Sequence, residues 1–168
     1  SIPWLLPVLG GLIIIAMAAI PGNENYLGLG AHSLNESGIS ILSAFSASGA
    51  ENWSWLWKLL FTAITLGFGF KGGEVTPLFF IGATLGNSLA VMLGLPVDWM
   101  AALGLIAVFA AGFHAPFTGV FLGVELFGFA GWPYYLLVCL VAATVKLRVE
   151  GLGFNGKTFN PHLSSKVK

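Results

Sequence analysis

A glycine-rich turn that leads straight into an apolar stretch is the part of this sequence whose residue types and spacing could do chemistry. Residues 72–77 read GGEVTP, and apolar residues follow. Proline suits the first turn of a helix, and the glycines leave the backbone accessible. The first N–H groups of a helix lie at the positive end of its dipole, so they can hold an anion without a cationic side chain. Such partial charges also let the ion leave again.

The segment therefore predicts an anion site made by Gly73, Glu74, Val75, Thr76 and Pro77. An ordinary polar loop between two membrane helices would show the same residues, and on this segment alone both interpretations stay open. The anion interpretation requires the turn to lie at membrane depth, where the free amides face a space of low dielectric constant.

Two aromatic residues follow this turn within the same apolar stretch. Phe79 and Phe80 are expected to line the path of the ion, because polarised ring edges can face an anion.

Other motifs predict neither a cofactor nor a metal. Residues 67–72 read GFGFKG, which fits G-x-G-x-x-G, but a dinucleotide site needs a preceding strand and a later acid that are missing here. His32, His114 and His162 have no partners at metal-ligand spacing. We expect His114 at a helix junction facing polar groups. Without an acid–base constellation, the sequence predicts that the protein is not an enzyme.

The composition indicates a membrane protein. Apolar residues make up 57% of the 168 residues, charged residues 8%, and the mean hydropathy is +0.88. A soluble domain usually carries about 25% charged residues. The formal net charge is zero, so no basic surface for nucleic acid is expected.

Six apolar stretches predict an all-α, polytopic membrane helical bundle. A straight span needs roughly 20 apolar residues, so we expect the shorter stretches to be partial spans that end inside the membrane. Basic residues from Lys146 to Lys168 favour a cytoplasmic end, as in a multi-pass protein of the cell (inner) membrane. Residues 150–168 form a polar tail that stays unassigned. The expected helices cover about 4–20, 53–70, 75–94, 99–113, 116–130 and 132–149.

Small residues recur four apart in two of these stretches. Gly82 and Gly86 form one such pair, and Gly119 and Gly123 form another. In lipid, such pairs let helix backbones approach closely, so the sequence predicts a tightly packed bundle.

Two motifs resemble the CLC (voltage-gated chloride channel) family. Residues 73–77, GEVTP, resemble its G-x-F-x-P anion motif, with valine at the phenylalanine position. Residues 115–125 resemble its A-P-x-T-G-x-x-x-x-x-E segment. The resemblance covers roughly residues 1–148 and implies the second half of a CLC-type inverted-repeat fold, whose complete chain forms a homodimer with one pore in each subunit.

The resemblance also implies roles for single residues. The backbone N–H groups of Glu74 and Val75 would bind the permeating anion, and Thr76 and Pro77 would shape the helix start. Glu125 matches a family glutamate, and we interpret it as a structural, buried carboxylate that needs partners.

The helices at 116–130 and 132–149 match helices that help to form the family's dimer interface. Phe127, Phe129 and Trp132 are candidates for that interface, although aromatic residues that face lipid at the membrane boundary would show the same pattern.

Some family motifs are not found in these 168 residues. The first-half motifs with the gating glutamate are missing, and no tyrosine follows the last predicted helix, where Phe154 or Phe159 would have to replace the pore tyrosine.

Residues 71–80, KGGEVTPLFF, look most like the bacterial branch of the family that exports fluoride in exchange for protons. The usual chloride motif has a hydrophobic residue where Glu74 stands, so this carboxylate has to point away from the anion or pair, for example with Lys71. The resemblance thus implies fluoride export coupled to protons, with anion, protons and the lipid bilayer as partners. The alternatives are a chloride channel or chloride/proton antiporter, and a non-transporting structural fragment that pairs with another half.

Overall fold

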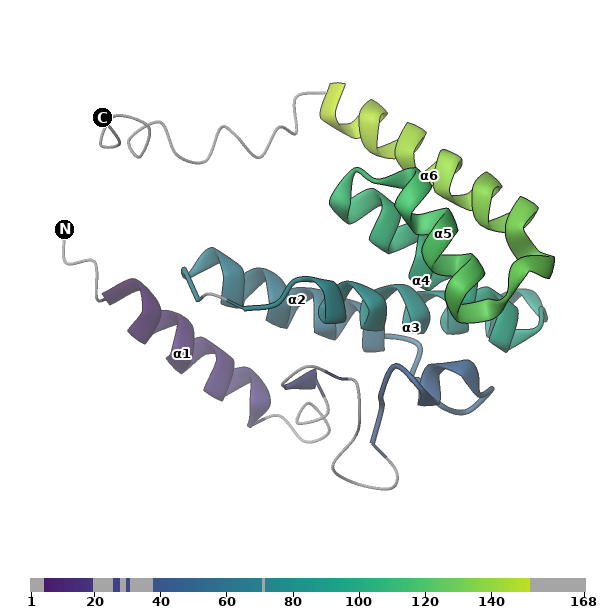
Figure 1. Cartoon of the computed structure of the whole chain (residues 1–168). Helices are drawn as coiled ribbons and strands as arrows, with labels where there is room; N and C mark the ends of the chain where they lie inside the picture. Colours follow the sequence, from purple (N-terminus) through teal and green to yellow (C-terminus); the bar gives the residue numbers. More distant parts are fainter. Residues whose placement is uncertain (1–4, 20–25, 28–29, 31–37, 71, 152–168) are drawn as a thin grey trace, which may run out of the picture.

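The computed structural model describes residues 5–19, 26–27, 30, 38–70 and 72–151 (Figure 1). The described residues form α-helices and short 3-10 turns and contain no β-strand, which confirms the all-α prediction. The elements are α1 (Leu5–Ala18), η2 (Ser43–Phe45), α2 (Ser54–Gly67), α3 (Val75–Leu93), α4 (Val97–Phe113), α5 (Pro116–Phe127), η3 (Phe129–Gly131) and α6 (Trp132–Gly151).

Helix ends differ from the predicted ones where the backbone imposes a break. Helix α5 ends at Phe127 rather than near residue 130, because Gly128 turns the chain with a φ of 91° and η3 follows. Helix α6 continues through Glu150, which the sequence analysis placed in the polar tail. After Pro133 in its first turn, α6 contains no proline or glycine before Gly151, so the helix can extend past its apolar part.

Two helical segments are long and apolar enough to cross a membrane, judged by length and composition among the described residues. They are α3 and the stretch from η3 through α6, residues 129–150. Helices α1, α4 and α5 are apolar but shorter. The 12 residues of α5 extend about 18 Å, well short of a hydrocarbon core about 30 Å thick.

Helix α3 lies in the middle of the molecule, between α2 on one side and α4 on the other (Figure 1). Its contact with α4 is the most extensive one between two helices, and it depends on glycines. A side chain at Gly82 would meet the carbonyl oxygen of Gly104 at 2.5 Å, and one at Gly86 would collide with the backbone of Met100. The backbones of α3 and α4 therefore touch directly.

We expect Gly86→Ala to destabilise the bundle by about 1–3 kcal/mol, because the added methyl group can be accommodated only if the two backbones separate. Thermal unfolding of the purified protein in detergent should show a lower midpoint than wild type. Gly11→Ala is the matched control, since open space surrounds that position in α1, and it should be neutral or slightly stabilising. Equal midpoints for Gly86→Ala and wild type would contradict the close contact.

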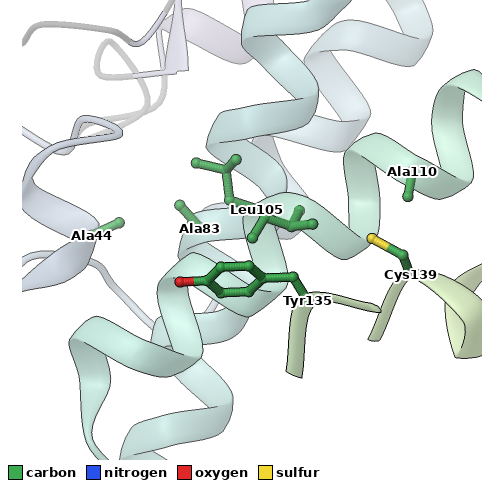
Figure 2. Packing of buried hydrophobic residues seen from close by; sticks show 7 residues of the cluster. Ala44, Ala83, Leu105, Ala110, Tyr135 and Cys139 are labelled. Atoms are coloured by element: carbon green, nitrogen blue, oxygen red, sulfur yellow. The ribbon is translucent and has the colours of Figure 1, made fainter. Parts of the chain in front are cut away.

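The main hydrophobic core lies where α3, α4, α5 and α6 meet. Figure 2 shows the ring of Tyr135 beneath Leu105, with the Cys139 thiol close to Ala110. These side chains are almost completely buried. The core fixes α4 relative to α6, and through α4 it holds α3 in place.

A buried amide attaches the segment before α2 to α3. The Asn87 side chain donates hydrogen bonds to the carbonyl oxygens of Ala44, at 2.7 Å, and Ser46, at 2.8 Å. Asn87 is 1% exposed. If its side chain were removed, both carbonyl oxygens would lose a donor that water could not easily replace. This contact fixes η2 against the middle of α3.

Candidate functional site

Helix α3 begins at the predicted anion motif. Glu74 is the N-cap residue, and its side chain makes no capping hydrogen bond. Leu78 donates the first bond of the helix, to the carbonyl oxygen of Glu74 at 3.3 Å. The amides of Glu74, Val75 and Thr76 therefore have no acceptor inside the helix, and Pro77 has no N–H to offer.

The backbone before this helix start can be approached from outside. Gly72, Gly73 and Glu74 are exposed, and Val75 is 40% exposed. A side chain at either glycine would meet no atom within 4 Å. Glu74 and Val75 thus lie on an exposed part of the chain, whereas Thr76 is half-buried. Lys71, the suggested partner of Glu74, lies outside the described residues.

The two phenylalanines of the motif lie in different surroundings. Phe79 is half-buried, and its ring lies 5.5 Å from that of Phe109 in α4. Phe80 is completely buried and packs with Tyr26, its ring centroid 6.3 Å from that of Tyr26 in an edge-to-face arrangement. The position of Phe80 in this chain does not favour the pore-lining role expected from the sequence, because its ring faces protein atoms.

A buried lysine faces the Phe80 ring. Lys58 of α2 is 2% exposed, its Nζ lies 5.3 Å from the centroid of the Phe80 ring, and it donates a 2.9 Å hydrogen bond to the carbonyl oxygen of Tyr26. The sequence analysis did not assign Lys58 a role. A lone charge within an apolar helix is the signal that could have found it, since such residues are costly to bury.

A cavity of about 210 Å³ connects this lysine with the motif. It lies between α1, α2 and the start of α3, and Lys58, Gly72, Gly73 and Pro77 are among its lining residues. Thr65 of α2 also lines it and donates its hydroxyl hydrogen to the carbonyl oxygen of Phe61 at 2.7 Å. The structure thus brings a buried cation and the predicted anion-binding turn to one cavity.

The second motif begins at the junction of α4 and α5. His114 ends α4 in the left-handed conformation, with a φ of 54°. Lys146 donates to its Nδ1 at 3.0 Å and also to the carbonyl oxygen of Ala111. Because lysine can only donate, Nε2 of His114 carries a proton and donates to Glu150 at 2.8 Å. The expectation of a junction histidine facing polar groups is confirmed.

The position of Glu125 corrects the expectation of a buried carboxylate. This residue of α5 is exposed in the chain, because it lies on the face of α5 opposite to Gly123, which packs against Tyr135. The fully buried residues of α5 are Gly119 and Gly123, whereas Phe117, Phe121 and Leu126 are exposed.

The three aromatic residues suggested for a dimer interface are divided between inside and outside. Phe127 is half-buried, its ring 5.6 Å from that of Phe45. Phe129 is 71% exposed and stacks on Trp132, which is 43% exposed. Phe129 and Trp132 therefore belong to the free apolar surface of this chain.

Comparison with known proteins supports the family resemblance. The family model described as voltage gated chloride channel matches residues 1–147. A chloride/fluoride channel protein of Pseudomonas syringae pv. tomato is 42% identical over 147 residues, which are 84% of this chain and 31% of that protein. The voltage-gated ClC-type chloride channel ClcB of Yersinia pestis is 35% identical over 96 residues, 52% of this chain and 23% of the relative.

A solved structure shares the arrangement of the helices. The crystal structure of a CLC-type fluoride/proton antiporter superposes with a TM-score of 0.75 at 36% sequence identity, covering 85% of this chain and 34% of that chain. The chain thus spans about a third of the length of the Pseudomonas syringae relative and of the solved antiporter. The matched model, the relatives and the shared helical arrangement show that this chain belongs to the voltage-gated chloride channel family of membrane proteins.

Proposed function

We propose that a full-length protein containing this chain exports fluoride across the cell inner membrane in exchange for protons, with the start of α3 in its anion path. The observation that carries the proposal is the open helix start, where the amides of Glu74, Val75 and Thr76 have no acceptor inside the helix. These partial charges bind an anion without holding it permanently.

The choice of fluoride rests on the demands of a small, strongly hydrated ion. A site that removes its water must supply several well-aimed donors in return. Three amides and the Thr76 hydroxyl occur together at one turn here. The solved relative, a fluoride/proton antiporter, supports the same choice.

Chloride transport is the alternative, as a channel or in exchange for protons. The names of both relatives include chloride, and an open helix start accepts either halide. The second alternative is a fragment that transports nothing and pairs with another half.

For the full-length protein we also propose a homodimer in which Phe129 and Trp132 contribute to the interface. Both side chains are exposed on one surface of the chain and stack on each other, and aromatic residues are common at the centre of protein interfaces. The remaining exposed apolar side chains of α6, such as Leu137, would face the lipid bilayer.

We expect proteoliposomes of the full-length protein to release fluoride faster than chloride, with proton movement in the opposite direction. Ion-selective electrodes for the two halides and a pH-sensitive dye inside the vesicles measure the three fluxes under one proton gradient. Vesicles without protein are the control. Equal or faster chloride flux would refute the fluoride assignment and support the chloride alternative, and halide flux without proton movement would refute the exchange.

A further inference from the structure

The buried lysine and the predicted anion-binding turn share one cavity, although they come from different helices. Lys58 belongs to α2, whereas Gly72, Gly73 and Pro77 belong to the turn and first residues of α3. Lys58 is 2% exposed in an apolar helix, so its charge loses hydration at a cost in free energy. A neutral side chain of similar size could fill the same space without that cost.

Two contacts of Lys58 partly offset the free-energy cost that burial imposes on its charged form. Its ammonium group donates to the carbonyl oxygen of Tyr26 and lies against the Phe80 ring, whose face attracts cations. In a space of low dielectric constant, a fixed positive charge attracts an anion more strongly than it would in water. The charge can act through space, so its effect on an anion needs no further hydrogen bond from Nζ.

We propose that Lys58 is a positioning residue for anion binding: its charge makes the cavity beside Gly72 and Gly73 favourable for a small monovalent anion that approaches the start of α3. This inference rests on the proposed function and adds to it a charge outside the recognised motif. A purely structural role, in which Lys58 attaches residue 26 to α2 by its hydrogen bond, is the competing explanation, and the experiment must separate charge from hydrogen bonding.

Three variants of the full-length protein make that separation. Lys58→Gln keeps an N–H donor for the Tyr26 carbonyl and removes the charge, whereas Lys58→Arg keeps the charge. Arg148→Gln removes an exposed charge from α6, which among the described residues contacts α4, α5 and η3 and not α2. Fluoride affinity is measured by calorimetry at low and high concentrations of a bulky salt such as sodium gluconate, and thermal unfolding is measured in parallel.

We expect Lys58→Gln to weaken fluoride binding about tenfold. This is the change in affinity expected when one charge that attracts the anion across roughly a nanometre of protein is removed. The loss should persist at high salt, because a buried charge is poorly screened. Lys58→Arg should restore most of the affinity, and Arg148→Gln should stay within about twofold of wild type. Wild-type affinity in Lys58→Gln would overturn the inference, as would equal weakening in Lys58→Gln and Lys58→Arg with unchanged unfolding midpoints.

A second pair of variants tests the same cavity if Lys58→Gln fails to fold. Thr65 is half-buried and lines the cavity, so Thr65→Lys adds a positive charge there and should strengthen fluoride binding, while Thr65→Gln should not. Unchanged affinity in a folded Thr65→Lys would count against a charge-sensitive cavity. A wild-type protein that binds neither fluoride nor chloride would instead refute the proposed function itself.

Discussion

Val75→Pro is expected to weaken fluoride binding by a full-length protein containing this chain about 10- to 100-fold. Val75 is the first residue of α3, and its N–H is one of three that have no acceptor inside the helix. Proline removes this donor, and losing a hydrogen bond to a charged group costs about 1.5–3 kcal/mol. Titration calorimetry with fluoride measures the change directly.

The fold should tolerate this proline. Proline is common at the first position of a helix, and the native chain already places Pro77 directly after Thr76 in the same turn. The remaining strain falls on Glu74, whose helical backbone angles are disfavoured before proline. Val75→Ala keeps the N–H and, because Val75 is 40% exposed, gives up little packing. If alanine weakens binding as much as proline does, the side chain rather than the amide carries the role.

Residues 1–168 by themselves are expected to move no fluoride or chloride across a membrane. The chain corresponds to 34% of the solved antiporter, and the start of α3 lies at an open face rather than in an enclosed path. An ion at that face would have no continuous wall of donors through the bilayer. Reconstituted alone, the chain should therefore give the same efflux as vesicles without protein.

Saturable efflux from such vesicles would contradict this expectation, since it would mean that the chain, alone or as an assembly of copies, completes a pore. A band of the correct size in the vesicle fraction, resistant to carbonate extraction, is the control that the chain was inserted. The structural-fragment alternative also predicts no flux from the chain alone. It differs in predicting no flux when the chain is paired with another half.

Sequence patterns predicted the features that follow from local chemistry. The turn at Gly73 with Pro77 four residues later predicted where α3 begins, and the pair Gly82 and Gly86 predicted a close helix contact. The helix start and the close contact both follow from the backbone conformations and the side-chain size of glycine and proline. The end of α5 was placed too late, because Ala130 and its apolar neighbours continue the hydropathy signal past the turn at Gly128.

Features that depend on the arrangement of distant segments could not be predicted. Phe80 and Lys58 are 22 positions apart, and no periodicity in the sequence reveals that the Phe80 ring faces the Lys58 ammonium group. Glu125 was expected to be buried because it matches a family glutamate, but neither the motif nor hydropathy says which side of α5 faces outward. The cavity beside Gly72 likewise arises only when α1, α2 and α3 come together.

The shortness of α5 has a consequence for how a ribosome delivers this chain to the membrane. A helix of 12 residues is too short to be retained by a translocon as an independent span. Helix α3 and the stretch from η3 through α6 are long and apolar enough to be retained. We therefore expect α5 to be integrated late, after synthesis of α6 has given it a partner in the bilayer. A nascent chain stalled once α5 has left the ribosome, but before α6 has, would leave α5 accessible to a water-soluble probe.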